Sequence, residues 1–196
     1  MARQSRAEAT RKRLLEATVE ALSECGYSGA STQEVCRRAG VSRGTLLHHF
    51  PTRTELLVAS LDAILADRVE HFMRTHRGNG AADTATLLKD LWSQWQGPVY
   101  AAWLELAVAA RTQPDLRQPM REVMARFDDQ ILAAFQELID FEPLPPGAEL
   151  AIPFVTFALF NGLAVGRSYE SDDREQPILQ LIELLAGMLP TRGDHP

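Results

Sequence analysis

Residues 31–53 read STQEVCRRAGVSRGTLLHHFPTR and predict two short helices that meet at a sharp angle. Ser31 and Glu34 are spaced as a capping box, in which each side chain accepts the backbone N–H of the other residue. Gly40 can supply the left-handed backbone conformation that a tight helix exit needs. Ser42 is placed to cap the second helix. The stretch therefore predicts a helix-turn-helix.

The apolar residues of this motif separate a buried face from an outward face. Val35, Cys36, Ala39, Val41 and Leu46 fall where the two helices would pack together. The second helix is left with polar groups at its exposed N-terminal end. A short helix held at right angles to a capped partner fits the major groove of DNA. The alternative is an ordinary helical corner within a bundle.

Motifs within and around the helix-turn-helix carry a family resemblance. They are Glu24-Cys25-Gly26-Tyr27, Ser31-Thr32, Ala39-Gly40-Val41-Ser42, Gly44-Thr45-Leu46, His49-Phe50 and Leu56-Leu57. With them, residues 8–58 resemble the N-terminal domain of TetR-family transcriptional regulators. The resemblance implies a homodimer, with repression as the family default. The chain departs from the family at Leu47, where an aromatic side chain often touches the DNA backbone, and at Arg53, which replaces a frequent Lys.

The residues predicted to contact DNA lie at the start of the first helix of the motif, along the second helix and just beyond it. They are Ser31, Thr32, Gln33, Ser42, Arg43, Gly44, Thr45, Leu47, His48, His49 and Arg53. Arg43 is expected to reach O6 and N7 of a guanine, and Arg53 to reach a phosphate. For Leu47 three roles stay open: contact with a thymine methyl, packing within the domain, or no contribution.

Charge is distributed unevenly along the chain. Residues 1–53 hold nine Lys or Arg against five Asp or Glu, whereas the remainder holds 11 basic and 21 acidic residues. A basic head on an acidic body suits a protein that holds a polyanion with one end only. We therefore predict that residues 1–53 form a domain that binds double-stranded operator DNA. Residues 54–196 are predicted to form a domain for effector binding and dimerisation.

Helical periodicity continues through the rest of the chain. After a first helix that ends at Gly26 and the two helices of the motif, helices are predicted over 54–76, 83–96, 98–111, 115–141, 148–169 and 174–189. No segment shows the period-2 alternation of a strand. We expect an all-α fold of about nine helices, three in the DNA-binding head and six in the body. The helix over 54–76 belongs to both and is the predicted mechanical link.

Two features bear on location. Cys25 and Cys36 are too few for a disulfide framework and favour reduced thiols in the cytoplasm. No signal peptide is indicated, because the apolar stretch after the basic N-terminus is broken by Glu16 and Glu20. Residues 150–166 carry no charge over 17 residues, fewer than the roughly 20 apolar residues of a spanning helix. We therefore expect a buried bundle helix there and no contact with a membrane.

Aromatic residues are concentrated in the predicted body, which indicates an apolar pocket with a few polar groups. The predicted ligand-binding residues are Trp92, Trp95, Tyr100, Trp103, Phe127, Phe157 and Asn161. For each residue taken singly, the alternative is an ordinary core position. We expect a small, largely apolar effector. No metal-binding spacing, phosphate-binding loop or catalytic motif occurs, so the sequence favours neither an enzyme nor a cofactor.

Small residues predict a dimer interface near the C-terminus. Ala158, Gly162 and Gly166 recur every four residues and form a smooth strip that another helix can approach closely. With Leu181 and Leu185 they would join two chains, although the strip could instead pack inside one chain.

Two classes of function remain open. The first is a ligand-responsive repressor that binds a palindromic operator as a homodimer. The second is an all-helical adaptor that keeps the fold without recognising an operator. Sequence-specific DNA binding that weakens steeply with salt would separate them.

Overall fold

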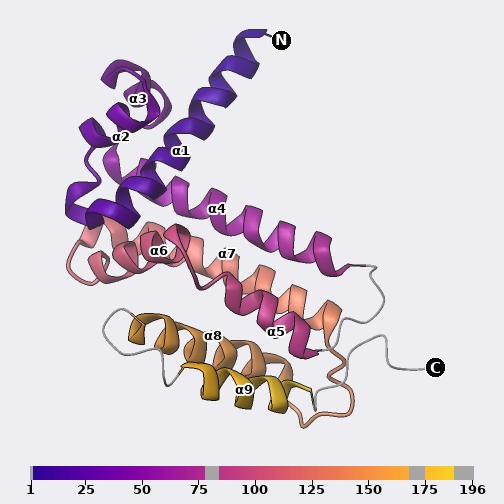
Figure 1. Cartoon of the computed structure of the whole chain (residues 1–196). Helices are drawn as coiled ribbons and strands as arrows, with labels where there is room; N and C mark the ends of the chain where they lie inside the picture. Colours follow the sequence, from indigo (N-terminus) through magenta and orange to yellow (C-terminus); the bar gives the residue numbers. More distant parts are fainter. Residues whose placement is uncertain (1, 78–83, 168–174, 188–196) are drawn as a thin grey trace. The chain divides into compact units, whose positions relative to one another are not determined.

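The computed structural model describes residues 2–77, 84–167 and 175–187, and these residues form helices and no strand (Figure 1). The helices are α1 (Ala2–Gly29), α2 (Thr32–Ala39), α3 (Arg43–His49), α4 (Arg53–His76), α5 (Thr84–Ser93), α6 (Pro98–Ala109), α7 (Pro114–Leu138), α8 (Ala148–Gly166) and α9 (Glu175–Ala186). The predicted all-α fold with nine helices is therefore confirmed for the described part of the chain.

Several helices end elsewhere than the periodicity predicts: α6 ends at Ala109 and α7 at Leu138, and the ends of α1 and α5 have a clear local cause. The first helix continues to Gly29 across a break at Gly26, whose φ of 68° is not helical. The helix α5 ends at Ser93, because the N–H groups of Gln94 and Trp95 bond to carbonyls three residues back and tighten the chain into a turn. Both ends depend on local hydrogen bonding that apolar spacing does not report.

The chain divides into two compact units, which are described separately. One comprises Met1–Asp67 with Gly97–Arg126, and the other Arg68–Gln96 with Phe127–Pro196. Both α4 and α7 contribute to each unit. The unit that contains the helix-turn-helix thus includes α6 as well and extends beyond residue 53. The functional division at residue 53 between DNA binding and effector binding stays a prediction.

The unit that contains the helix-turn-helix is built on one apolar core. Leu14, Leu22, Val35, Leu46 and Leu57 are each exposed by 1% or less. These residues come from α1, α2, α3 and α4, and α1 also packs against α6. Complete burial of such side chains contributes about 1.5–3 kcal/mol each. This core fixes α2 and α3 relative to the helices that support them.

The capping residues behave largely as predicted. The Ser31 hydroxyl accepts the Glu34 N–H at 3.2 Å, and the Ser42 hydroxyl accepts the Thr45 N–H at 3.1 Å. Gly40 lies in the left-handed region with φ of 63°. The reciprocal half of the Ser31–Glu34 box is wrong, because the Ser31 N–H donates to a backbone carbonyl and the Glu34 carboxylate turns to arginines.

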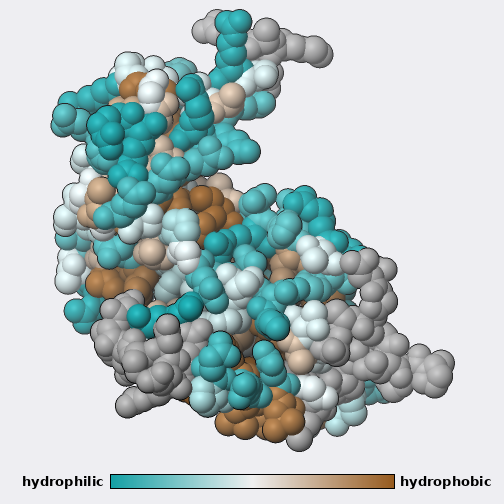
Figure 2. Space-filling model, in the orientation of Figure 1, coloured by the Kyte–Doolittle hydropathy of each residue, from teal (hydrophilic) through white to brown (hydrophobic). Residues whose placement is uncertain are grey.

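The prediction of a buried helix over residues 150–166 is wrong for the single chain. Only 17% of the apolar window of α8 is buried, although by length and composition this helix could cross a membrane. Leu150, Phe154, Val155 and Leu159 are each 45% exposed or more. Large apolar side chains of α9 are exposed as well, and Figure 2 shows apolar surface over this helix. An uncharged sequence signals burial but does not distinguish a core from an interface.

Candidate functional site

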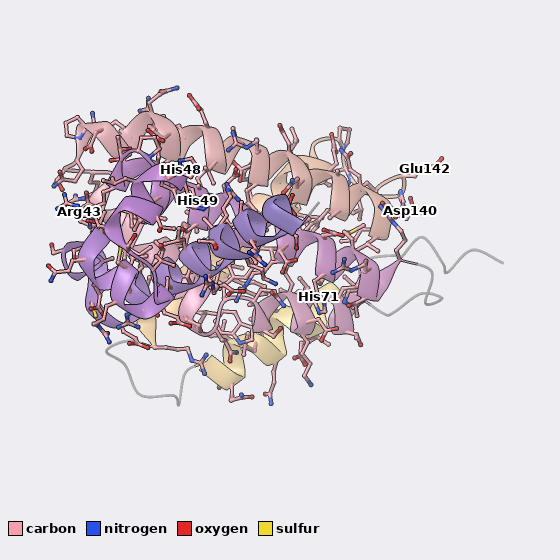
Figure 3. All side chains as sticks on the ribbon, turned by 90° about the horizontal axis from the view of Figure 1, so that it is seen from above. Arg43, His48, His49, His71, Asp140 and Glu142 are labelled. Carbon is pink, nitrogen blue, oxygen red and sulfur yellow. The ribbon has the colours of Figure 1, made fainter. Side chains whose placement is uncertain are left out.

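The outward face of α3 carries most of the predicted DNA-contacting residues. Leu46 is fully buried, and this anchors the helix on the core. Arg43, Gly44, Leu47 and His48 are exposed, and Figure 3 labels Arg43, His48 and His49 along α3. Leu47 is 42% exposed, so it does not pack fully within the domain. A capped helix with a guanidinium at its N-terminal end can present that group to base edges in a groove.

The remaining predicted DNA-contacting residues flank this face. Thr45 and His49 are half-buried, and the Thr45 hydroxyl shares a 2.9 Å hydrogen bond with Ser42. Ser31 and Thr32 are half-buried at the start of α2, whereas Gln33 is exposed. Ser31, Thr32, Gln33 and Thr45 lie in the first turns of α2 and α3, where backbone N–H groups favour phosphate oxygens, whereas His49 is the last residue of α3. Their assignment to DNA contacts stays a prediction.

Arg53 has partners within the chain, and its predicted contact with phosphate stays a prediction. Its guanidinium donates hydrogen bonds to the backbone carbonyls of Ala30, at 3.0 Å, and Tyr27. The same group lies 4.3 Å from the centre of the Tyr27 ring. Arg53 thus links the start of α4 to the segment that joins α1 to α2. The sequence does not predict these hydrogen bonds, because their acceptors are backbone carbonyls, which every residue carries.

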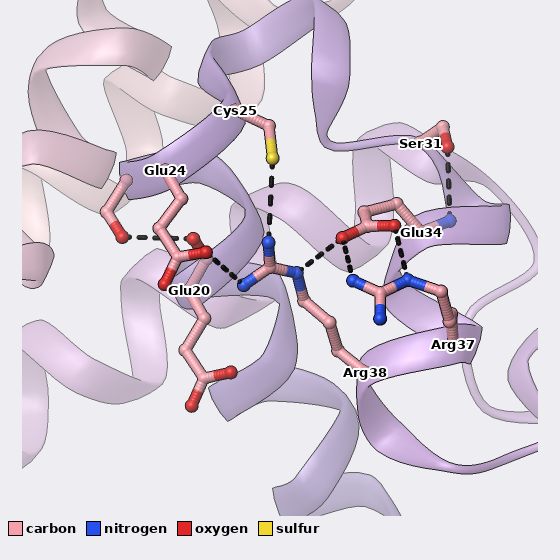
Figure 4. Close-up of polar contacts among 8 residues, drawn as sticks. Glu20, Glu24, Cys25, Ser31, Glu34, Arg37 and Arg38 are labelled. Carbon is pink, nitrogen blue, oxygen red and sulfur yellow. Dashed lines mark hydrogen bonds and ion pairs between the residues drawn. The ribbon is translucent and has the colours of Figure 1, made fainter.

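A network of charges joins α1 to α2 (Figure 4). The Glu34 carboxylate accepts hydrogen bonds from Arg37 at 2.6 and 2.8 Å and from Arg38 at 2.7 Å. Hydrogen bonds from Arg37 and Arg38 lower the pKa of Glu34 to about 2. Arg38 also forms a 2.8 Å ion pair with Glu24 of α1. The spacing of Glu34 to these arginines, three and four residues, would have predicted the pairs within α2.

The break in α1 is held by a residue from α6. The Glu105 carboxylate accepts the Tyr27 N–H at 2.8 Å. Gly26 has a positive φ of 68°, and a Cβ atom placed there would lie 3.0 Å from Glu105 Oε2. Glycine therefore allows both the backbone turn and the close approach of the carboxylate.

The predicted ligand-binding residues fall into both compact units. Trp92, Trp95, Phe127, Phe157 and Asn161 belong to the unit that contains α8. The centre of the Phe157 ring lies 4.7 Å from that of Trp95 and 5.7 Å from that of Phe127, with edge-to-face geometry in both pairs. Trp95 Nε1 donates to the Asn161 side-chain oxygen at 3.3 Å. These contacts make an aromatic cluster with one amide among the rings.

The other two residues of the predicted set lie on α6 in the unit that contains the helix-turn-helix. The Tyr100 and Trp103 rings stack with their centres 5.5 Å apart. Trp103 Nε1 lies 3.3 Å from the sulfur of Met124, and burial raises the pKa of Tyr100. Ligand binding by either group of aromatic residues stays a prediction.

Arg68 of α4 is a half-buried cation. Its guanidinium donates to the backbone carbonyl of Gln94, next to Trp95. Burial lowers the pKa of Arg68. No carboxylate of the described residues pairs with it. A cation removed from water in this way favours an acceptor close by.

The predicted dimerisation residues are largely exposed. Ala158 and Gly162 are exposed, Gly166 is half-buried, and Leu181 and Leu185 are 54% and 55% exposed. A Cβ atom placed at Gly162 would meet no atom within 4 Å. The alternative packing of this strip inside one chain is therefore not found at Gly162. The interface itself stays a prediction.

Comparison with known proteins identifies relatives of the whole chain. A sequence profile of bacterial regulatory proteins of the tetR family matches residues 14–60. An uncharacterized HTH-type transcriptional regulator of Mycobacterium bovis is 32% identical over 193 residues, covering 95% of this chain and 97% of that protein.

Solved structures share the fold. A transcriptional regulator from Rhodococcus sp. Rha1 matches with a TM-score of 0.67 and 25% identity, over 91% of this chain and 95% of that chain. A protein from Saccharomonospora viridis, solved in complex with choline, matches with a TM-score of 0.69 over 93% of this chain and 98% of that chain. The identity to this second protein is 16%, so that comparison concerns the fold alone.

Proposed function

Because this chain belongs to the TetR family of bacterial transcriptional regulators, we propose that it acts as a homodimeric repressor in the cytoplasm. In this proposal the dimer binds a palindromic operator, and a small, largely apolar molecule releases it. The observation that carries the proposal is the arrangement of α3, which buries Leu46 and exposes Arg43, Gly44 and His48.

The exposed apolar faces of α8 and α9 support the homodimer. Phe154, Val155, Leu181, Leu184 and Leu185 are each more than half exposed in the single chain. An apolar surface of this kind favours association. A two-fold axis would present two α3 helices to half-sites about one DNA turn, roughly 34 Å, apart. Dimerisation in this way would supply the second recognition helix that tight operator binding needs.

The aromatic cluster around Phe157 supports a small-molecule effector. Its rings offer apolar contact, and Asn161 offers an amide. The choline complex of the Saccharomonospora viridis protein supports a small-molecule site in this fold. The contribution of Tyr100 and Trp103, which belong to the other unit, is proposed separately from that of the cluster.

Effector control requires that the ligand prefer one arrangement of the two α3 helices over another. In this proposal two helices transmit the effect of the bound ligand to α2 and α3. One is α4, and the other is α6, which begins three residues after Trp95 and carries Glu105. We propose that effector binding displaces these helices and changes the separation of the recognition helices, so that both half-sites cannot be occupied together.

DNA-binding measurements on the full chain test this proposal. An operator is first selected from random duplex DNA, and its Kd is then measured across a range of salt concentrations. We expect a palindromic site. The logarithm of the binding constant should fall linearly with the logarithm of the salt concentration, because phosphate contacts release counterions. Equal affinity for the selected and scrambled sequences would contradict operator recognition and favour the adaptor. Transcription from a promoter that carries the selected site distinguishes repression from activation.

A further inference from the structure

A groove lies between α5, α9 and the end of α8, and Trp92 is the one predicted effector residue among those that line it. It encloses about 480 Å³, within the roughly 300–1,000 Å³ typical of small-molecule sites. All of its lining residues belong to the unit that contains α8. We call it the α9 groove.

The inner side of the α9 groove is apolar. Leu88 and Trp92 come from α5, and Phe160 comes from α8. The Trp92 and Phe160 rings lie 5.1 Å apart, and both side chains are nearly completely buried. Leu179 and Ile182 of α9 complete the apolar lining. This surface suits the hydrocarbon part of a ligand.

The α9 groove also carries two cations close to Trp92. Lys89 lies one helical turn before Trp92 on α5, and the Arg167 guanidinium lies 5.9 Å from the centre of the Trp92 ring. Lys89 is exposed and forms no ion pair with a described residue. Glu183 is the acidic lining residue and comes from α9. Two cationic side chains, Lys89 and Arg167, thus line the groove beside Trp92.

We propose that the α9 groove binds a small amphipathic carboxylate. The hydrocarbon part lies against the apolar lining, which includes the partly exposed Leu179 and Ile182, and the carboxylate lies between Lys89 and Arg167. Glu183 would repel a carboxylate placed beside α9, which favours this orientation. The combination of an apolar inner side with two cations distinguishes an anionic ligand from a neutral or cationic one of the same length.

The α9 groove shares Trp92 with the residues predicted to bind the effector and is otherwise a separate site. Trp95, Phe127, Phe157 and Asn161 do not line it. The Phe160 ring contacts Trp92 and Trp95, at 5.1 and 5.4 Å, and so lies between the groove and the aromatic cluster. A ligand in the groove would contact the face of α9 that is turned toward α5, and would leave the exposed Leu181 and Leu185 accessible.

Calorimetric titration of the full chain tests the proposal with three probes of equal chain length: octanoate, octanol and octylammonium. We expect octanoate to bind most tightly. Lys89→Gln should weaken octanoate binding about two- to fivefold, as expected for loss of an exposed charge contact, and should leave octanol unaffected. Lys12→Gln is the matched control, because Lys12 is exposed on α1 and does not line the groove. Glu183→Gln should strengthen octanoate binding.

Three results would overturn the proposal. They are equal affinity for octanoate and octanol, octanoate affinity that is the same in Lys89→Gln and the unsubstituted chain, and equal weakening by Lys12→Gln. Each variant changes one exposed or half-exposed side chain, so the fold should be retained. Operator binding is not part of this measurement. Failure here would leave the proposed repressor function standing, and loss of operator recognition would not affect the octanoate result.

Discussion

The carboxylate of Glu105 on α6 accepts the backbone N–H of Tyr27, 2.8 Å away, directly after the break in α1. The two residues are 78 positions apart in the sequence. A hydrogen bond from a backbone N–H to a charged acceptor is stronger than a neutral one. This contact connects α6 to the segment that leads into α2, and it belongs to a single compact unit. The hydrogen bond thus links α6 to the helix-turn-helix.

Replacing Glu105 by Ala should lower the free energy of unfolding by about 0.5–1.5 kcal/mol, because Glu105 is exposed and water screens its charge. Glu105→Gln should lose less, because an amide oxygen can still accept the Tyr27 N–H. Urea unfolding measures both. Glu8→Ala is the control, since Glu8 is exposed and forms no hydrogen bond or ion pair within the described residues. Equal free energies of unfolding for Glu105→Ala and Glu8→Ala would show that the Glu105–Tyr27 hydrogen bond does not stabilise the fold.

Arg53 should contribute to stability in addition to any contact with phosphate. Arg53→Ala removes two hydrogen bonds to the carbonyls of Tyr27 and Ala30, and we expect a loss of about 1–3 kcal/mol. Arg53→Lys keeps the charge but cannot reproduce the guanidinium geometry, so most of the loss should remain. Urea unfolding and DNA titration are compared for both variants. Unchanged stability with weaker DNA binding would assign Arg53 to phosphate alone.

The local parts of the fold could be predicted because their determinants are close in sequence. Ser31, Gly40 and Ser42 cap helices through neighbouring backbone groups, and the structure contains these caps. The roles of Arg53 and Glu105 could not be predicted, because both side chains bond to backbone atoms that are distant in sequence. Composition carries no information about such contacts.

The apolar helix α8 shows a second limit of prediction. Its lack of charge indicated burial, yet Phe154 and Val155 are 51% and 56% exposed in the single chain. Periodicity identifies which residues avoid water but not whether the covering surface belongs to the same chain. The same limit applies to the aromatic residues, since clustering in sequence placed Trp95 and Trp103 together while the structure places them in separate units.

Arg43→Ala should weaken binding to the selected operator by about 1–3 kcal/mol and relax specificity at one base pair. The reason is that Arg43 is the exposed guanidinium at the N-terminal end of α3. Titrations against operator and scrambled DNA measure the effect. An equal loss of affinity for both DNAs would show that Arg43 contacts phosphate and does not contact a base.

The network around Glu34 predicts a stability that depends on pH. The pKa of Glu34 is about 2 in the folded chain, below its ordinary value of 4.5. A lowered folded pKa stabilises the fold fully above the unfolded value, and the contribution is lost as pH falls from about 4.5 toward 2. Thermal unfolding of the Glu34→Gln variant should therefore depend less on pH across this range than that of the unsubstituted chain. Parallel pH profiles for the two proteins would exclude a contribution from Glu34.

Gly162→Leu should convert the proposed dimer to monomers with poor operator affinity. Gly162 is exposed on α8, and a Cβ atom at this position meets nothing within the chain. The added side chain would hold apart two helices that approach closely across an interface. Leucine is a better helix former than glycine by nearly 1 kcal/mol, so α8 itself should remain folded. Sedimentation velocity measures the oligomeric state.

The matched control for this substitution is Ala133→Leu, which adds an apolar side chain at an exposed position of α7. We expect the control to remain dimeric and to bind the operator normally. If both variants sediment as dimers, the strip of Ala158, Gly162 and Gly166 is not the interface, and the exposed leucines of α9 become the region to substitute next. If both sediment as monomers, the interface includes α7. Only dissociation confined to Gly162→Leu assigns the interface to the strip on α8.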